Sequence, residues 1–171
     1  DAAYMASDEG QFLTAFAKGL MQRWELNLST VDSNDSATYI ADMQKLINAE
    51  LNEISKYRDV TFSDDTFNQK AHDYINDLDK QMDSLNYYTT DYNKYANEWS
   101  DAYGDRSLII SYFLNNYPVK IDDKYADIKN ELSTVAKSTE ESKVLEKDIN
   151  SMINTESFEL VEDSYGYKTY K

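Results

Sequence analysis

Apolar residues recur at every third or fourth position through most of this chain, a spacing that places them on one face of an α-helix. A first stripe follows Ser7, whose side chain can cap a helix, and continues to Leu28. A polar loop over residues 29–36 separates it from a second stripe, which predicts a helix from Ala37 to Tyr57. The first stripe consists of Phe12, Leu13, Phe16, Leu20, Trp24 and Leu28.

The longest periodic segment covers residues 63–103 and contains no proline or glycine. It predicts one helix of about 35 residues, roughly 50 Å long at 1.5 Å per residue, which Gly104 ends. The β-branched and turn-prone residues Thr89–Asp91 mark the place where we expect any break or kink. Its stripe consists of Phe67, Ala71, Tyr74, Leu78, Met82, Leu85, Tyr88, Tyr92, Tyr95 and Trp99.

Shorter helices are predicted after this segment. One apolar helix begins at Asp105 and ends before Pro118, which excludes a helical conformation for the residue preceding it. A fifth helix is expected from about Asp123 to Lys137, and a capping-box sequence at residues 138–141 opens a sixth.

The helical period is lost at Ser157. Residues 158–171 alternate instead and predict two strands around a Ser-Tyr-Gly turn. We therefore expect an all-α fold, an elongated bundle of five to six helices around one long helix, with a short C-terminal β-hairpin-like tail. The expected domains are a helical bundle over residues 1–157 and the start of a truncated β domain over residues 158–171.

The composition agrees with a helical chain and argues against some classes of binding partner. The 171 residues include one proline, four glycines and no cysteine, and the net charge is -15. Because glycine and proline favour tight turns, a chain with so few of them is expected to form few such turns. The acid excess argues against nucleic acid and anionic membranes, which need clustered Lys and Arg. No apolar run approaches the roughly 18 residues of a membrane span, so membrane attachment is expected only through an anchor upstream of Asp1.

Residues able to carry chemistry are sparse. His72 is the single histidine, and a zinc or iron site usually needs at least two His or Cys ligands. Asp32, Asn34 and Ser36 match the first ligand positions of a calcium loop, but Met43 stands where that loop needs a glutamate, so a polar capping loop explains them better. No serine lies at a known catalytic spacing from the histidine. We predict no catalytic residue, no cofactor and no metal.

Aromatic residues near the end of the long segment form the strongest candidate binding surface. Tyr87 and Tyr103 fall off the apolar stripe and are predicted to face solvent, where they could contact a protein, a peptide or a glycan. The other aromatic residues of this run belong to the core stripe: Tyr88, Tyr92, Tyr95 and Trp99.

Two residues of the first helix predict how it meets a neighbour. Gly19 would let another helix approach closely, at a cost of about 1 kcal/mol in helix propensity. Arg23 can bridge to an acid on a neighbouring helix, either Glu50 or a carboxylate of residues 63–103.

Three segments together carry a resemblance to a known group of proteins: Gly19–Trp24, Ala49–Asp59, and Phe62 with Tyr74, Ile75 and Leu78. They resemble the extracellular helical region of Gram-positive (Firmicutes) surface proteins and lipoproteins. In that group a lipobox or membrane helix precedes the helices, and a β domain of the FxLYD type often follows. The resemblance covers most of residues 8–110 and implies architecture and an envelope-attached, extracellular location, with no assigned activity.

These observations favour a non-catalytic cell-surface interaction or spacer module of a bacterial envelope protein. The alternative is a peptide- or carbohydrate-binding protein that uses exposed tyrosines. An enzyme is the third hypothesis, and it would need buried carboxylates that converge in a cleft.

Overall fold

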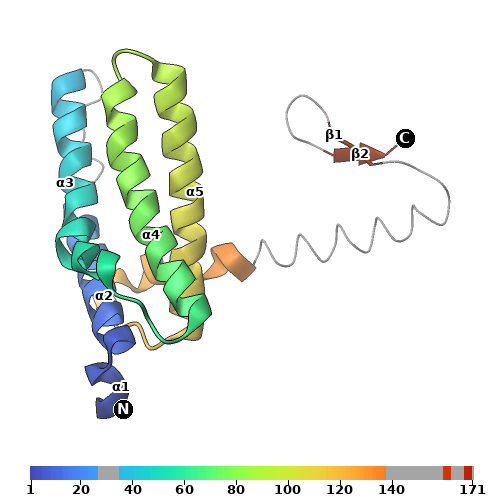
Figure 1. Ribbon diagram of the computed structural model, residues 1–171. Helices are drawn as coiled ribbons and strands as arrows, with labels where there is room; N and C mark the ends of the chain where they lie inside the picture. Colours follow the sequence, from blue (N-terminus) through green and yellow to red (C-terminus); the bar gives the residue numbers. More distant parts are fainter. Residues whose placement is uncertain (27–34, 138–159, 163–167, 171) are drawn as a thin grey trace. The chain divides into compact units, whose positions relative to one another are not determined.

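The computed structural model describes residues 1–26, 35–137, 160–162 and 168–170, and the chain divides into two compact units, Asp1–Ser133 and Thr134–Lys171. Every regular element described in the first unit is helical, which confirms the all-α class (Figure 1). The elements of that unit are α1 (Ala2–Ala6), α2 (Asp8–Glu25), α3 (Ser36–Ile54), η2 (Ser55–Asp59), α4 (Asp65–Ser84), η3 (Leu85–Tyr87), α5 (Tyr92–Asn116) and η4 (Asp123–Tyr125). A further helix covers residues 126–137, of which residues 126–133 belong to the first unit.

Helices α2 and α3 begin where the sequence predicts them. Ser7 caps α2 by accepting a hydrogen bond from the Gly10 amide at 3.2 Å, and Asp35 caps α3 in the same way through the Ala37 amide. Gly19 lies against α3 as expected, because a Cβ built on it would lie 3.0 Å from the Cα of Glu50. The sequence analysis did not predict α1, which Asp1 caps.

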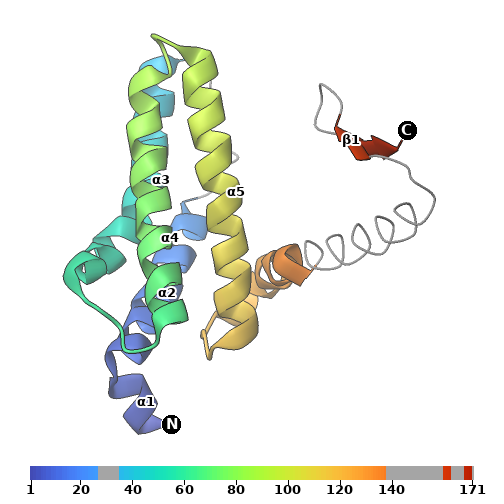
Figure 2. The ribbon, with the colours of Figure 1, turned by 45° about the vertical axis from the view of Figure 1, so that its right-hand side comes forward.

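The prediction of one long helix over residues 63–103 is wrong. The segment forms α4 and the first part of α5, through residue 103; the two helices lie side by side and are joined at one end by a short turn (Figures 1 and 2). The break falls at the Thr89–Asp91 sequence, where the Asp91 amide bonds to the Tyr87 carbonyl at 2.8 Å and the Asp91 carboxylate caps α5. Gly104 does not end a helix, since α5 continues through it to Asn116. Asp105 therefore starts no helix of its own.

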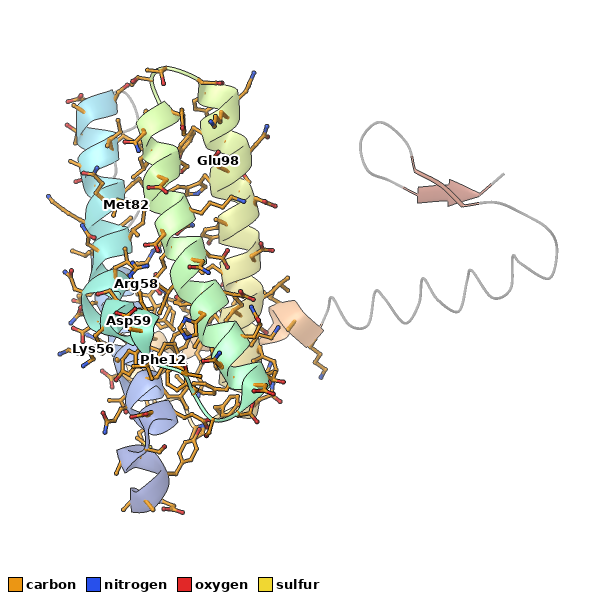
Figure 3. All side chains as sticks on the ribbon, in the orientation of Figure 1. Phe12, Lys56, Arg58, Asp59, Met82 and Glu98 are labelled. Carbon is orange, nitrogen blue, oxygen red and sulfur yellow. The ribbon has the colours of Figure 1, made fainter. Side chains whose placement is uncertain are left out.

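The core of the first unit is rich in aromatic rings. Phe12 is completely buried, and its ring centre lies 5.4–6.0 Å from the ring centres of five neighbours in α2, η2, α4, α5 and the segment before α4. Figure 3 labels Phe12 in the lower part of the bundle, where many side chains gather. These neighbours are Phe16, Tyr57, Phe62, Phe67 and Phe113.

The chain leaves α5 at Tyr117, directly before Pro118, and continues through η4 into the helix over residues 126–137. Tyr125 brings this segment against α2, with its ring centre 5.5 Å from that of Trp24. Trp24 is half-buried, so it contributes less to the core than its place on the apolar stripe predicts.

The second unit contains two short strands, β1 (Leu160–Glu162) and β2 (Lys168–Tyr170), paired antiparallel with Val161 opposite Thr169. The expected turn between the strands, the sixth helix and the boundary near Ser157 lie outside the described residues. Within the described residues, no helix is long and apolar enough to cross a membrane.

Candidate binding surface

A buried ionic cluster connects the four long helices of the bundle. Glu50 of α3 is 1% exposed, and its Oε2 accepts hydrogen bonds from Arg23 Nη1 of α2 and Arg106 Nη2 of α5, each at 2.8 Å. Its Oε1 accepts a hydrogen bond from the hydroxyl of Tyr74 of α4. We call these four residues the Glu50 cluster.

The Glu50 cluster is charged at neutral pH. Burial alone would raise the pKa of Glu50, but the charges of Arg106 and Arg23 and the Tyr74 hydroxyl outweigh it and hold this pKa below its ordinary value. Burial raises the pKa of Tyr74 well above its ordinary value, so the phenol stays protonated and donates. Both carboxylate oxygens of Glu50 therefore accept hydrogen bonds within the cluster. The Glu50 cluster links the helices and presents no free acid or base to a substrate.

The structure confirms the predicted bridge from Arg23 and selects Glu50 from the two alternatives. Sequence reasoning missed Arg106 and Tyr74. Arg106 lies four residues from both Ala102 and Ile110, which are completely buried, so it falls on the buried face of α5. A buried arginine needs an acidic partner that is buried as well. The place of Arg106 on the buried face of α5 could therefore have predicted its ion pair with Glu50.

Exposed aromatic side chains gather along one face of α5. Tyr92 is 61% exposed and Tyr103 is 47% exposed, while Trp99 between them is half-buried. Spacings of seven and four residues place the three on the same side of the helix, over about 16 Å. We call them the aromatic strip. Tyr103 is exposed as the sequence predicts, whereas Tyr92 was wrongly assigned to the core.

A second layer of tyrosines supports one end of the aromatic strip. Tyr95 of α5 is buried, and its ring centre lies 5.6 Å from that of Tyr92 and 5.9 Å from that of Trp99. Burial raises the pKa of Tyr95, and so does its hydroxyl contact with Tyr39 of α3. Tyr39 in turn stacks on Tyr88, with ring centres 4.4 Å apart. The exposed ring of Tyr92 thus packs on a layer of aromatic rings formed by Tyr95, Tyr39 and Tyr88.

Tyr87, the other predicted surface residue, is not part of this strip. Its ring is half-buried against the core, and the Lys94 ammonium lies 4.0 Å from the ring centre. The prediction that Tyr87 faces solvent freely is therefore wrong. The ring is held in a cation–π contact within one end of the bundle.

The candidate metal ligands have other roles where the structure describes them. Nε2 of His72 lies 2.7 Å from the main-chain carbonyl oxygen of Val60. Ser36 is the first residue of α3, and the other two residues of the calcium-like pattern, Asp32 and Asn34, lie outside the described residues. Among the described residues, no group of three or more acidic, histidine or cysteine side chains could hold a metal ion.

No protein-family model, curated protein or solved structure matches this chain.

Proposed function

We propose that this chain is a non-catalytic interaction module of a bacterial envelope protein, displayed outside the cell. The observation that carries the proposal is the aromatic strip, in which the two most exposed rings share a helical face and one of them, Tyr92, packs on the buried Tyr95. Tyrosine and tryptophan provide large, rigid contact surfaces and dominate binding energies at interfaces. A strip of this kind suits a protein, peptide or glycan partner.

Two further features support a non-catalytic module. The buried ionisable residues of the Glu50 cluster bond to one another, so their perturbed pKa values have a structural cause. The net charge of -15 disfavours association with anionic polymers such as nucleic acid. The extracellular setting rests on the resemblance of residues 8–110 to Gram-positive surface proteins.

The alternative function is capture of a small peptide or carbohydrate by the same strip. Sugars and extended peptides both stack on aromatic faces, and a length of about 16 Å suits a short linear ligand. The two hypotheses differ in the partner: a defined short ligand favours the alternative, and a folded protein partner favours the interaction module.

The first test is binding of the folded chain to glycan and peptide arrays and to candidate surface proteins. Tyr92→Ala and Tyr103→Ala should each weaken binding at least about tenfold, because each removes an exposed ring of the strip. Leu108→Ala is the matched control, since Leu108 is 37% exposed on a different face of α5. Unchanged binding by both tyrosine variants, or an equal loss with Leu108→Ala, would contradict the proposal.

The location has a separate test. Brief trypsin treatment of intact cells that carry the full-length protein should release peptides from residues 8–110. Release only after the cells are lysed would show that the module is not displayed outside.

We further propose that the strands Leu160–Glu162 and Lys168–Tyr170 belong to one hairpin that opens a β domain after the helical region. Their antiparallel register, with Leu160 opposite Tyr170, supports this. Deletion of residues 158–171 should leave the helical content and melting temperature of the bundle nearly unchanged.

A further inference from the structure

A groove of about 440 Å³ lies between α4 and α5, and most of its polar lining is acidic. Three carboxylates face it, Asp73 and Asp77 from α4 and Asp105 from α5. Its remaining lining residues are Lys70, Asn76, Leu108 and Ile109. Like charges brought this close across two helices repel one another unless a cation or a proton intervenes.

Asp77 is the least well compensated of these carboxylates. Its Oδ2 is buried and has no hydrogen-bond partner among the described residues. An ionised carboxylate oxygen that has lost its water without gaining a donor is unfavourable, whereas a protonated one is not.

The nearby cations are already engaged. On α4, the Lys80 ammonium bonds to Asp101 of α5 at 2.7 Å, and the Lys70 ammonium lies 5.0 Å from the centre of the Tyr112 ring. Asp101 adds a further negative charge on the α5 side.

Two charged groups on the other elements that pack against α4 are paired with neighbours as well. Glu50 of α3 is neutralised by Arg23 and Arg106, and Arg58 of η2 makes a two-pronged ion pair with Asp79. None of these pairs supplies a free cation to the groove.

We propose that this groove is a pH switch, in which Asp77 holds a proton in mildly acidic solution and its loss near neutrality weakens the packing of α4 against α5. Burial is the largest cause that raises the pKa of Asp77; together with the charges of Asp105, Asp73 and Asp101, and against the opposing charge of Lys80, it brings this pKa to about 7. An unfolded aspartate titrates near pH 4, about three units lower.

The direction of the effect follows from this difference. Between about pH 4 and pH 7 the folded chain binds a proton on Asp77 that the unfolded chain has released. Binding to the folded state alone stabilises it, so the stabilisation is complete below about pH 4 and is lost as the pH rises through 7. This switch goes beyond the proposed binding function and does not depend on it.

The decisive measurements are carboxyl-carbon NMR of the wild-type chain and thermal unfolding of matched variants. The Asp77 carboxyl resonance should titrate with a midpoint near 7. Asp77→Asn, which is neutral at every pH, should raise the melting temperature at pH 8 by at least about 3 °C and flatten its fall between pH 5.5 and 8.

Asp83→Asn is the matched control, because Asp83 is an exposed carboxylate of the same helix. It should retain the wild-type dependence on pH. A midpoint near 4 for Asp77, or an unchanged pH slope in Asp77→Asn, would overturn the proposal. The NMR titration uses the wild-type chain and decides the question even if the variant does not fold.

Discussion

Gln81 of α4 is completely buried, and neither its amide nitrogen nor its amide oxygen has a hydrogen-bond partner among the described residues. Leaving polar atoms buried without partners costs about 1–3 kcal/mol. Methionine has nearly the same shape and no such requirement, so Gln81→Met should stabilise the chain by about 1–2 kcal/mol, measured by urea unfolding. Gln44→Met, at an exposed position of α3, should change stability by less than about 0.5 kcal/mol. A destabilised Gln81→Met would show that the amide has a polar partner in solution.

At the same scale, the sequence predicted the direction of side chains better than the degree to which they are buried. Phe12, Tyr74 and Tyr95 are buried as their stripes predict. Tyr92 and Ile110 are five turns apart on the same face of α5, yet Tyr92 is 61% exposed and Ile110 is completely buried. Periodicity assigns a direction to a side chain, but burial also requires that a neighbouring element reach that turn, and the pattern carries no information about that.

Two glycines in helices should respond in opposite ways to substitution by alanine. Gly104 lies within α5, and nothing lies within 4 Å of a Cβ built there, so Gly104→Ala should stabilise by about 0.5–1 kcal/mol through helix propensity. Gly19→Ala would place its methyl group 3.0 Å from a main-chain atom of α3 and should destabilise by about 1–2 kcal/mol despite the same gain in propensity. Thermal unfolding of both variants tests the pair. Equal effects would show that α2 and α3 are not in close contact at Gly19.

The same contrast explains which helix boundaries the sequence predicted. A lone glycine costs a helix only about 1 kcal/mol, which packing of α5 readily exceeds, so Gly104 was a poor stop signal. Thr89–Asp91 was a better one, because Asp91 can cap a new helix and bonds to the Lys94 amide at 3.1 Å. The sequence showed where a break was possible, but whether α4 and α5 fold back depends on packing between distant residues such as Phe67 and Phe113, whose ring centres lie 5.2 Å apart.

The stability of the whole bundle should depend on Glu50. Glu50→Gln leaves Arg23 and Arg106 buried without a countercharge, and breaking a buried ion pair in this way costs about 3–5 kcal/mol. That is a large share of the roughly 5–15 kcal/mol that holds a typical domain together. Guanidinium unfolding should show it as a lower midpoint.

Glu53→Gln is the matched control, one turn further along α3. Glu53 is more exposed and pairs with Lys18 at 3.5 Å, so its replacement should cost less than about 1 kcal/mol. Because the folded pKa of Glu50 is depressed, its contribution is complete above about pH 4.3 and is lost as the pH falls below that value. Equal costs for the two variants would mean that the Glu50 cluster does not hold the bundle together.

The Glu50 cluster also has a consequence for synthesis of the chain. Arg23 and Glu50 leave the ribosome well before Arg106, which lies 56 residues after Glu50 in the sequence. At about 5–20 residues per second, the nascent chain waits about 3–11 seconds for the second arginine. If α2 and α3 packed together during that interval, Glu50 would be buried with Arg23 but without the hydrogen bonds that Arg106 donates. Assembly of the bundle during translation is therefore expected to wait until α5 has emerged.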